Sequence, residues 1–125
     1  MYEFNFRLEK SLEERFKESE RIMKENPDRI PVICELGPQS KFPGIHKTKF
    51  LVPRDMTVNQ FHFILKRMIN IDETRAMYLM ADNNKSYKML LLNKTMEECY
   101  NSYHDKKDNF LYIYYLSEIV NGSNL

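Results

Sequence analysis

The sequence feature that most constrains the fold is a pair of short apolar segments bracketed by prolines. The first reads Pro27-Asp28-Arg29-Ile30-Pro31-Val32-Ile33-Cys34-Glu35, and the second reads Lys49-Phe50-Leu51-Val52-Pro53. Both are too short for helices and rich in β-forming residues, so they predict strands. Proline removes a backbone donor and is typical of strands at a sheet edge. The block therefore predicts an exposed edge with which the backbone of a partner could pair.

Three helix starts share one device, a hydroxyl N-cap followed three residues later by Glu or Gln. The pairs are Ser11/Glu14, Thr57/Gln60 and Thr95/Glu98. Each such pair satisfies two backbone donors that a helix start otherwise leaves without partners. Apolar residues follow each start at helical spacing, and we expect them to face the core. They are Leu12, Phe16, Ile22 and Met23; then Val58, Phe61, Ile64, Leu65 and Met68; then Met96, Cys99, Tyr100 and Tyr103.

Four strands are predicted, at residues 30–34, 49–52, 77–80 and 110–116. Asn83-Asn84-Lys85 indicates a turn, and the leucines at 90–92 beyond it indicate either a further short strand or a buried loop. A helical N-terminal segment, which includes the start at Ser11, comes before the first strand, and the helices that start at Thr57 and Thr95 fall between the later strands. This order predicts an α+β fold in which one sheet packs across a central helix.

The length and net charge of the chain limit the classes of function that it can have. A chain of 125 residues favours a single domain with its own core, and a net charge of +1 provides no field for gathering polyanions. We therefore expect no nucleic-acid partner. The N-terminus lacks the apolar run of a signal peptide, and the apolar run at 110–116 is too short to span a bilayer as a helix. These features predict a cytoplasmic protein.

Enzymatic chemistry is not expected. Cys99, His104 and Asp105 are the residue types of a thiol acyl-transfer site, but Cys99 and His104 are five positions apart, off the spacing that brings helical side chains together. Cys34 and Cys99 are instead expected to be reduced thiols in the core. His46 and His62 have no companion ligands at metal spacing, so no metal or other cofactor is predicted.

The proline-bracketed block, together with Thr57-Val58-Asn59-Gln60-Phe61 and Phe110-Leu111-Tyr112, closely resembles the autophagy ubiquitin-like modifiers. This is the family of GABARAP and the microtubule-associated protein light chains. The resemblance implies a ubiquitin-like β-grasp domain with two N-terminal helices packed on its core. It divides the chain into a helical extension at 1–25, a β-grasp domain with a flexible tail at 26–122, and a removed peptide at 123–125. The connection between Asn83 and Thr95 is longer than in the family and has no assigned role.

The resemblance places the modified glycine of the family at Gly122. It implies that a cysteine protease cleaves between Gly122 and Ser123, and that activating and conjugating enzymes then attach Gly122 to phosphatidylethanolamine on autophagosomal membranes. A glycine in a frayed terminus is also common without any function. Asn121 stands where the family has an aromatic residue. Two functions stay open: a lipid-conjugated modifier, or a non-lipidated adaptor that only docks peptides.

The resemblance also implies a docking groove. In the family, cargo receptors and adaptors insert an aromatic-x-x-aliphatic motif with acidic neighbours into two pockets beside the second strand. The aromatic pocket maps to Glu18, Ile22, Pro31, Ile33, Lys49, Leu51 and Phe110, and the aliphatic pocket to Phe50, Val52, Pro53, Met56, Phe61 and Ile64. Arg29, Lys47 and Lys49 would attract the acidic neighbours. Strand periodicity alone predicts that Phe50 and Val52 face one side and Lys49 and Leu51 the other.

Overall fold

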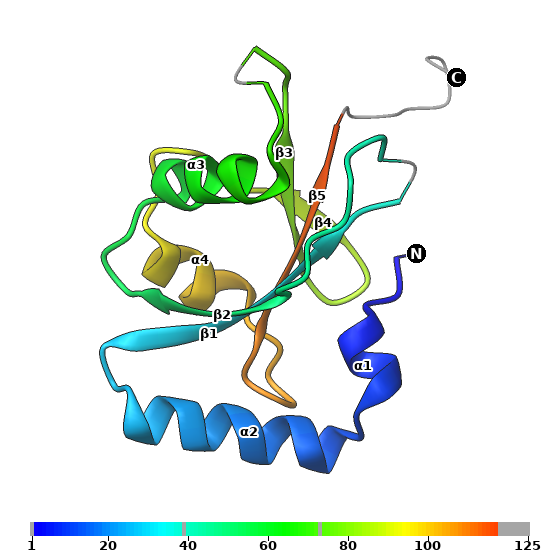
Figure 1. Ribbon diagram of the computed structural model, residues 1–125. Helices are drawn as coiled ribbons and strands as arrows, with labels where there is room; N and C mark the ends of the chain where they lie inside the picture. The colour runs from blue at the N-terminus through cyan, green and yellow to red at the C-terminus, as the bar shows by residue number, and fades with distance from the viewer. Residues whose placement is uncertain (1, 39, 73, 118–125) are drawn as a thin grey trace.

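The computed structural model describes residues 2–38, 40–72 and 74–117 of the chain. It has the predicted α+β architecture, with helices and strands in the order that the sequence indicates (Figure 1). The elements are α1 (Asn5–Glu9), α2 (Leu12–Glu25), β1 (Arg29–Leu36), β2 (Lys49–Pro53), α3 (Val58–Ile69), β3 (Tyr78–Asp82), β4 (Tyr87–Met89), α4 (Met96–Tyr103) and β5 (Leu111–Leu116).

The strands form a five-stranded sheet in the order β2-β1-β5-β3-β4. β1 and β5 are parallel at its centre, and the other pairings are antiparallel. Helices cover both faces: α3 and α4 lie on one side, and α1 and α2 on the other (Figure 1). Alternation along the central strands sends Val32 and Ile113 into the core under α3 and α4, whereas Ile33 and Tyr112 pack toward the N-terminal helices. β2 is one of the two edge strands.

All three predicted helix starts are confirmed. Ser11, Thr57 and Thr95 each accept a hydrogen bond from the backbone N–H three residues later, and the Glu or Gln at that position bonds back. These reciprocal bonds satisfy donors that would otherwise need water. They fix where α2, α3 and α4 begin.

The expected apolar stripes are only partly buried. Val58, Phe61 and Leu65 of α3 are in the core, and so are Met96, Cys99 and Tyr100 of α4. On α2 the expectation is wrong for Leu12 and Phe16, which are exposed. The buried residues of α2 are Ser19 and Ile22, because only one side of this helix faces the sheet and no other described element covers its outer side (Figure 1). Ile64 and Met68 of α3 are exposed as well.

The strand predictions need two corrections, and the first helix is short. β1 is an internal strand despite Pro31, since its pairing with β5 begins only at Val32 and demands no donor from the proline. The leucines at 90–92, read as either a short strand or a buried loop, form neither throughout: the strand lies at Tyr87–Met89, and of the three leucines only Leu90 is buried. The first N-terminal helix is short: α1 covers only Asn5–Glu9, and Lys10 is already extended.

Other elements follow the expectations closely. The turn between β3 and β4 has Asn84 and Lys85 at positive φ, which suits the predicted turn.

Across the described ranges, no helix has the length and apolar character needed to cross a membrane.

The short helix α1 is held by a buried carboxylate. Glu35 of β1 accepts hydrogen bonds from the backbone N–H groups of Asn5 and Phe6 and from the hydroxyl of Tyr2. Phe4 and Phe6 are buried against Tyr112 of β5, and Phe6 also meets Phe110 just before that strand. A five-residue helix is not stable in isolation, so these contacts are what keep α1 in place.

Candidate functional site

Along the edge strand β2, alternate residues direct their backbone N–H and C=O groups toward β1 and away from it. In an antiparallel pair, residues alternate between those that bond to the neighbouring strand and those whose backbone groups point away. The Cys34 N–H donates to the Thr48 carbonyl at 2.8 Å, which places the bonded pairs at even positions of β2. Pro31, which has no N–H, lies opposite Leu51. The N–H and C=O groups of Lys49 and Leu51 therefore point outward from the sheet edge.

The side chains of β2 alternate as predicted. Phe50 and Val52 are buried under α3, where the Phe50 and Phe61 rings meet edge to face. Lys49 and Leu51 point to the opposite face, and 39% of Leu51 is exposed. The edge strand thus presents different surfaces on its two sides, one toward α2 and the other toward α3.

The residues mapped to the aromatic pocket gather on the α2 side. Ile22 of α2, Ile33 of β1 and Phe110 belong to one buried cluster, and Leu51 lies beside Pro31 at its outer edge. The Lys49 ammonium forms an ion pair with the Glu18 carboxylate of α2. This pair bridges β2 and α2, so the apolar cluster is covered in the free protein.

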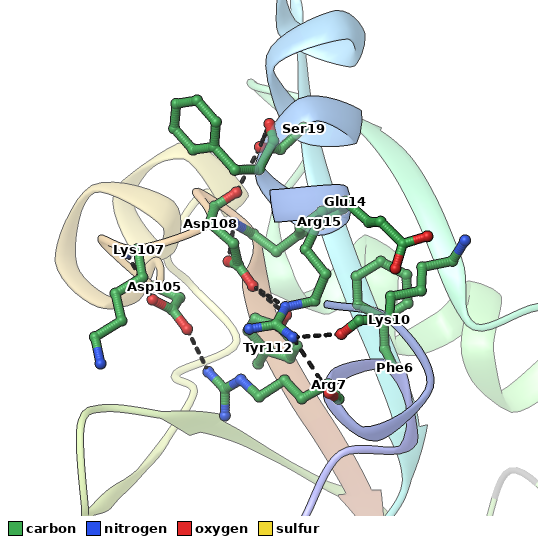
Figure 2. Close-up of polar contacts among 12 residues, drawn as sticks. Phe6, Arg7, Lys10, Glu14, Arg15, Ser19, Asp105, Lys107, Asp108 and Tyr112 are labelled. Atoms are coloured by element: carbon green, nitrogen blue, oxygen red, sulfur yellow. Dashed lines mark hydrogen bonds and ion pairs between the residues drawn. The ribbon is translucent and has the colours of Figure 1, made fainter. Parts of the chain in front are cut away.

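The position of α2 depends on a buried polar cluster at the start of β5 (Figure 2). Asp108 is fully buried and accepts hydrogen bonds from Arg15 Nε at 2.9 Å and from the Tyr112 hydroxyl at 2.5 Å. The Ser19 hydroxyl donates to the Asp108 carbonyl, and the Phe110 N–H donates to the Asp108 carboxylate. Because Arg15 and Ser19 lie on α2, this cluster fixes the helix that carries Glu18 and Ile22.

The residues mapped to the aliphatic pocket lie on the α3 side. Pro53, Met56 and Ile64 line an open hollow of about 780 Å³ between the end of β2 and α3. Phe50, Val52 and Phe61 do not reach it, because they are buried beneath in the core. The sequence mapping missed the other side chains that line the hollow: Asp55, Asn59, Gln60, His62, Phe63 and Lys66. The spacing of Asn59 and Phe63 on a capped helix is the signal that could have found part of this set.

Basic groups surround the edge strand. Arg29 Nη1 donates to the outward Leu51 carbonyl at 3.2 Å, and the Lys47 ammonium lies 5.1 Å from the centre of the Phe50 ring. Partial burial lowers the pKa of Lys49, and the nearby Lys10 ammonium lowers it further. The three basic residues expected beside the groove therefore do lie at this edge.

Of the residues considered for acyl transfer, Cys99 is buried, and His104 and Asp105 have other partners. Burial raises the pKa of the Cys99 thiol to about 11, the opposite of what an activated nucleophile needs. His104 Nδ1 lies 2.7 Å from the Tyr100 carbonyl, and Asp105 pairs with Arg7. Cys34 is also a buried free thiol. Within the described part of the chain, no three His, Cys, Asp or Glu side chains are grouped to hold a metal ion. Gly122, Asn121 and Ser123 lie outside the described residues.

This sheet order, with a helix packed across one face and two further helices at the N-terminus, defines a ubiquitin-like protein with a helical extension. The family described as "Autophagy protein Atg8 ubiquitin like" matches residues 14–122. The chain belongs to this family.

Relatives and solved structures agree. Autophagy-related protein 8 of Mycosarcoma maydis is 38% identical over 94% of this chain and 95% of its own length. Autophagy-related protein 8a of Arabidopsis thaliana is 37% identical over 98% of this chain and 97% of its own. The crystal structure of Trypanosoma brucei ATG8 has a TM-score of 0.83 at 28% identity, covering 97% of this chain and 100% of that one. Plasmodium falciparum Atg8, in complex with a peptide of Plasmodium falciparum Atg3, has a TM-score of 0.79 at 34% identity, covering 94% of this chain and 98% of that one.

Proposed function

We infer that this protein is an autophagy modifier that docks aromatic-x-x-aliphatic peptides of receptors and adaptors along β2. One observation carries the inference: the backbone groups of Lys49 and Leu51 point outward from an edge strand that has an apolar site on each side. An extended peptide can add to such an edge through main-chain hydrogen bonds, while its side chains enter the flanking pockets.

The spacing of the motif fits the two sites. Side chains three positions apart in an extended peptide point to opposite faces. The aromatic residue would therefore enter on the α2 face, beside Ile22 and Leu51, and the aliphatic residue on the α3 face, beside Met56 and Ile64. This arrangement explains why two intervening residues separate the anchors.

Docking would exchange contacts that the free protein makes with itself. The Arg29 guanidinium holds the Leu51 carbonyl, and Lys49 pairs with Glu18 over the aromatic site. A peptide N–H would replace Arg29 at this carbonyl, and acidic peptide residues would take up the released Arg29 and Lys49, with Lys47 nearby. The Arg29 contact is a hydrogen bond to an exposed carbonyl that the peptide N–H would replace, so this exchange costs little free energy. The Glu18 carboxylate is largely buried, with its side chain 14% exposed, so acidic peptide residues must compensate for loss of its pair with Lys49.

The covalent half of the function rests on family membership. Gly122 is the residue that would be exposed by a cysteine protease, activated, and joined to phosphatidylethanolamine on the autophagosomal membrane. The structure of Plasmodium falciparum Atg8 with an Atg3 peptide supports a conjugating-enzyme partner for this chain. Before conjugation the protein would be cytoplasmic. The protein would be the substrate of its partner enzymes, which catalyse the conjugation, and it would itself bind receptors and adaptors.

Asn121 favours a second function, that of a docking adaptor without lipid. An aromatic side chain before the glycine would bury apolar area in a protease subsite, worth about 2 kcal/mol, and asparagine does not. This adaptor would keep the groove and lack the conjugation.

Mass spectrometry of the protein from its own cells distinguishes the two functions. A lipid modifier predicts loss of residues 123–125 and a phosphatidylethanolamine adduct on Gly122 when autophagy is induced. A Gly122→Ala variant serves as the control and should show no adduct. Detection of only full-length, unmodified protein under induction would contradict the modifier and leave the adaptor.

A further inference from the structure

Two large exposed apolar side chains have no role in the core: Phe63, which lines the outer part of the aliphatic hollow, and Leu92, which lies outside its lining. Phe63 of α3 is 49% exposed, and Leu92, in the segment between β4 and α4, is 46% exposed. Leu91, beside Leu92, is exposed as well. Large exposed apolar side chains that gather in one region are a common mark of a binding surface.

Phe63 and Leu92 come from distant parts of the sequence but lie near the same helix start. The Asn59 N–H donates to the Leu92 carbonyl at 3.0 Å, and the Val58 N–H donates to the Lys94 carbonyl at 2.8 Å. The segment joining β4 to α4 therefore lies against the first turn of α3 (Figure 1). Asn59 and Phe63 are one helical turn apart on the same side of α3, so Leu92 is within about two turns of Phe63.

The surface is continuous with the aliphatic site. The hollow that Pro53 and Met56 line at the end of β2 is also lined by Asn59 and Phe63. A ligand that fills the aliphatic site thus has an open route across the first turns of α3.

The order of the two sites along β2 sets the direction of a docked peptide. The aromatic site adjoins Lys49 and Leu51, and the aliphatic site adjoins Pro53, so the motif runs parallel to β2. Residues after the aliphatic position would leave β2 toward α3. At about 3.3 Å per residue, three or four further residues span the one or two helical turns to Phe63 and Leu92.

We propose that Phe63 and Leu92 form a third apolar site of the docking groove, which binds an apolar residue three or four positions after the aliphatic residue of the same peptide. The proposal rests on the inferred docking function and adds a preference among peptides. Its chemistry is aliphatic or aromatic: the Phe63 ring offers a flat apolar face, with the Arg67 guanidinium 5.7 Å from its centre.

Fluorescence anisotropy with three labelled peptides tests the third site. The core peptide has three glutamates followed by tryptophan, two glutamates and leucine. One extended form adds glycine and serine residues, and the other adds the same number of residues with leucine at the third and fourth positions. The wild-type protein should bind the leucine form about tenfold more tightly than the glycine-serine form, as expected for burial of one or two leucine side chains.

Variants of the protein show which residues produce the gain in affinity from the added leucines. Leu92→Ser should bring the ratio of the two extended affinities close to one and leave the affinity for the core peptide unchanged. Phe63→Ser should also bring that ratio close to one, but it should weaken the core peptide as well, because Phe63 lines the hollow of the aliphatic site. Leu12→Ser, which changes an equally exposed leucine on α2, should keep the tenfold ratio. Urea midpoints equal to that of the wild type would show that the variants are folded.

The outcomes separate this proposal from the docking function. Binding of the core peptide with no gain from the leucines, or a gain that survives in both variants, would overturn the third site alone. Failure of the wild-type protein to bind any of the three peptides would overturn the docking function and the third site together.

Discussion

At the scale of single residues, the contrast between Phe50 and Leu51 decides how the groove can be tested. Both were mapped to the pockets, but Phe50 is 6% exposed and Leu51 is 39% exposed. Phe50→Ala would leave a cavity in the core and destabilise the fold by about 3–5 kcal/mol. A loss of peptide binding in that variant would therefore say little about docking.

Leu51→Ala is the informative change. It should weaken binding of an acidic aromatic-x-x-aliphatic peptide by about 1–3 kcal/mol, since apolar contact with the aromatic anchor is lost. Isothermal titration calorimetry measures the effect, and Leu8→Ala, on the exposed side of α1, is the matched control. An affinity equal to that of the wild type would show that the aromatic residue does not dock beside Leu51.

Residue patterns predicted the direction of side chains correctly, but they predicted less well which of those side chains are buried. Strand alternation separated Phe50 from Leu51 correctly. Helical spacing predicted that both Leu12 and Ile22 face the core, yet only Ile22 is buried. Whether an apolar stripe is covered depends on how closely the helix approaches the sheet, and local sequence does not contain that information.

At the scale of elements, the contact between α2 and β5 supports the aromatic site. Arg15, Ser19 and Tyr112 all bond to Asp108, a residue without any exposed surface. Removing one partner of a buried ionic cluster leaves uncompensated charge and unsatisfied donors. The cluster therefore couples the stability of the fold to the placement of α2.

Asp108→Ala should lower the free energy of unfolding by about 3–5 kcal/mol, because Arg15 loses its buried partner. Urea denaturation followed by circular dichroism measures the change. Asp105→Ala is a matched control: Asp105 is 18% exposed and shares Arg7 with Asp82, so its loss should cost about 1 kcal/mol. Equal effects of the two substitutions would contradict the role given to Asp108.

Elements with strong end signals were predictable, and those defined by tertiary contacts were not. The capping residues fixed the starts of α2, α3 and α4. The short strand β4 was placed too late, because its position follows from pairing with β3 and from the turn at Asn84 and Lys85. The hollow beside α3 was missed in part, since Asn59 and Phe63 join it only through the approach of β2.

At the scale of the whole molecule, buried thiols and phenols make stability depend on high pH. Burial raises the pKa of Cys99 to about 11 and of Tyr100 and Tyr115 to about 12, and it raises the pKa of Cys34 as well. In the unfolded chain these groups ionise near about 8.5 for cysteine and about 10 for tyrosine. Above those values the unfolded state binds fewer protons than the folded state, so stability falls as pH rises.

The urea midpoint should therefore be constant from pH 7 to about 8 and decrease steadily between pH 9 and about 11. Returning the sample to pH 7 should restore it. A Cys99→Ala variant should show a shallower decrease, because one of the linked groups is gone. A midpoint that stays constant up to pH 11 would contradict the burial of these groups.

The central claim is that β2 is a docking strand, and amide hydrogen exchange measured by nuclear magnetic resonance tests it most directly. In the free protein the amides of Lys49 and Leu51 should exchange quickly, and those of Phe50 and Val52 should be protected by β1. Saturation with an acidic aromatic-x-x-aliphatic peptide should protect Lys49 and Leu51 and leave Phe50 and Val52 unchanged. Peptide binding that leaves the Leu51 amide as quick to exchange as before would contradict the account.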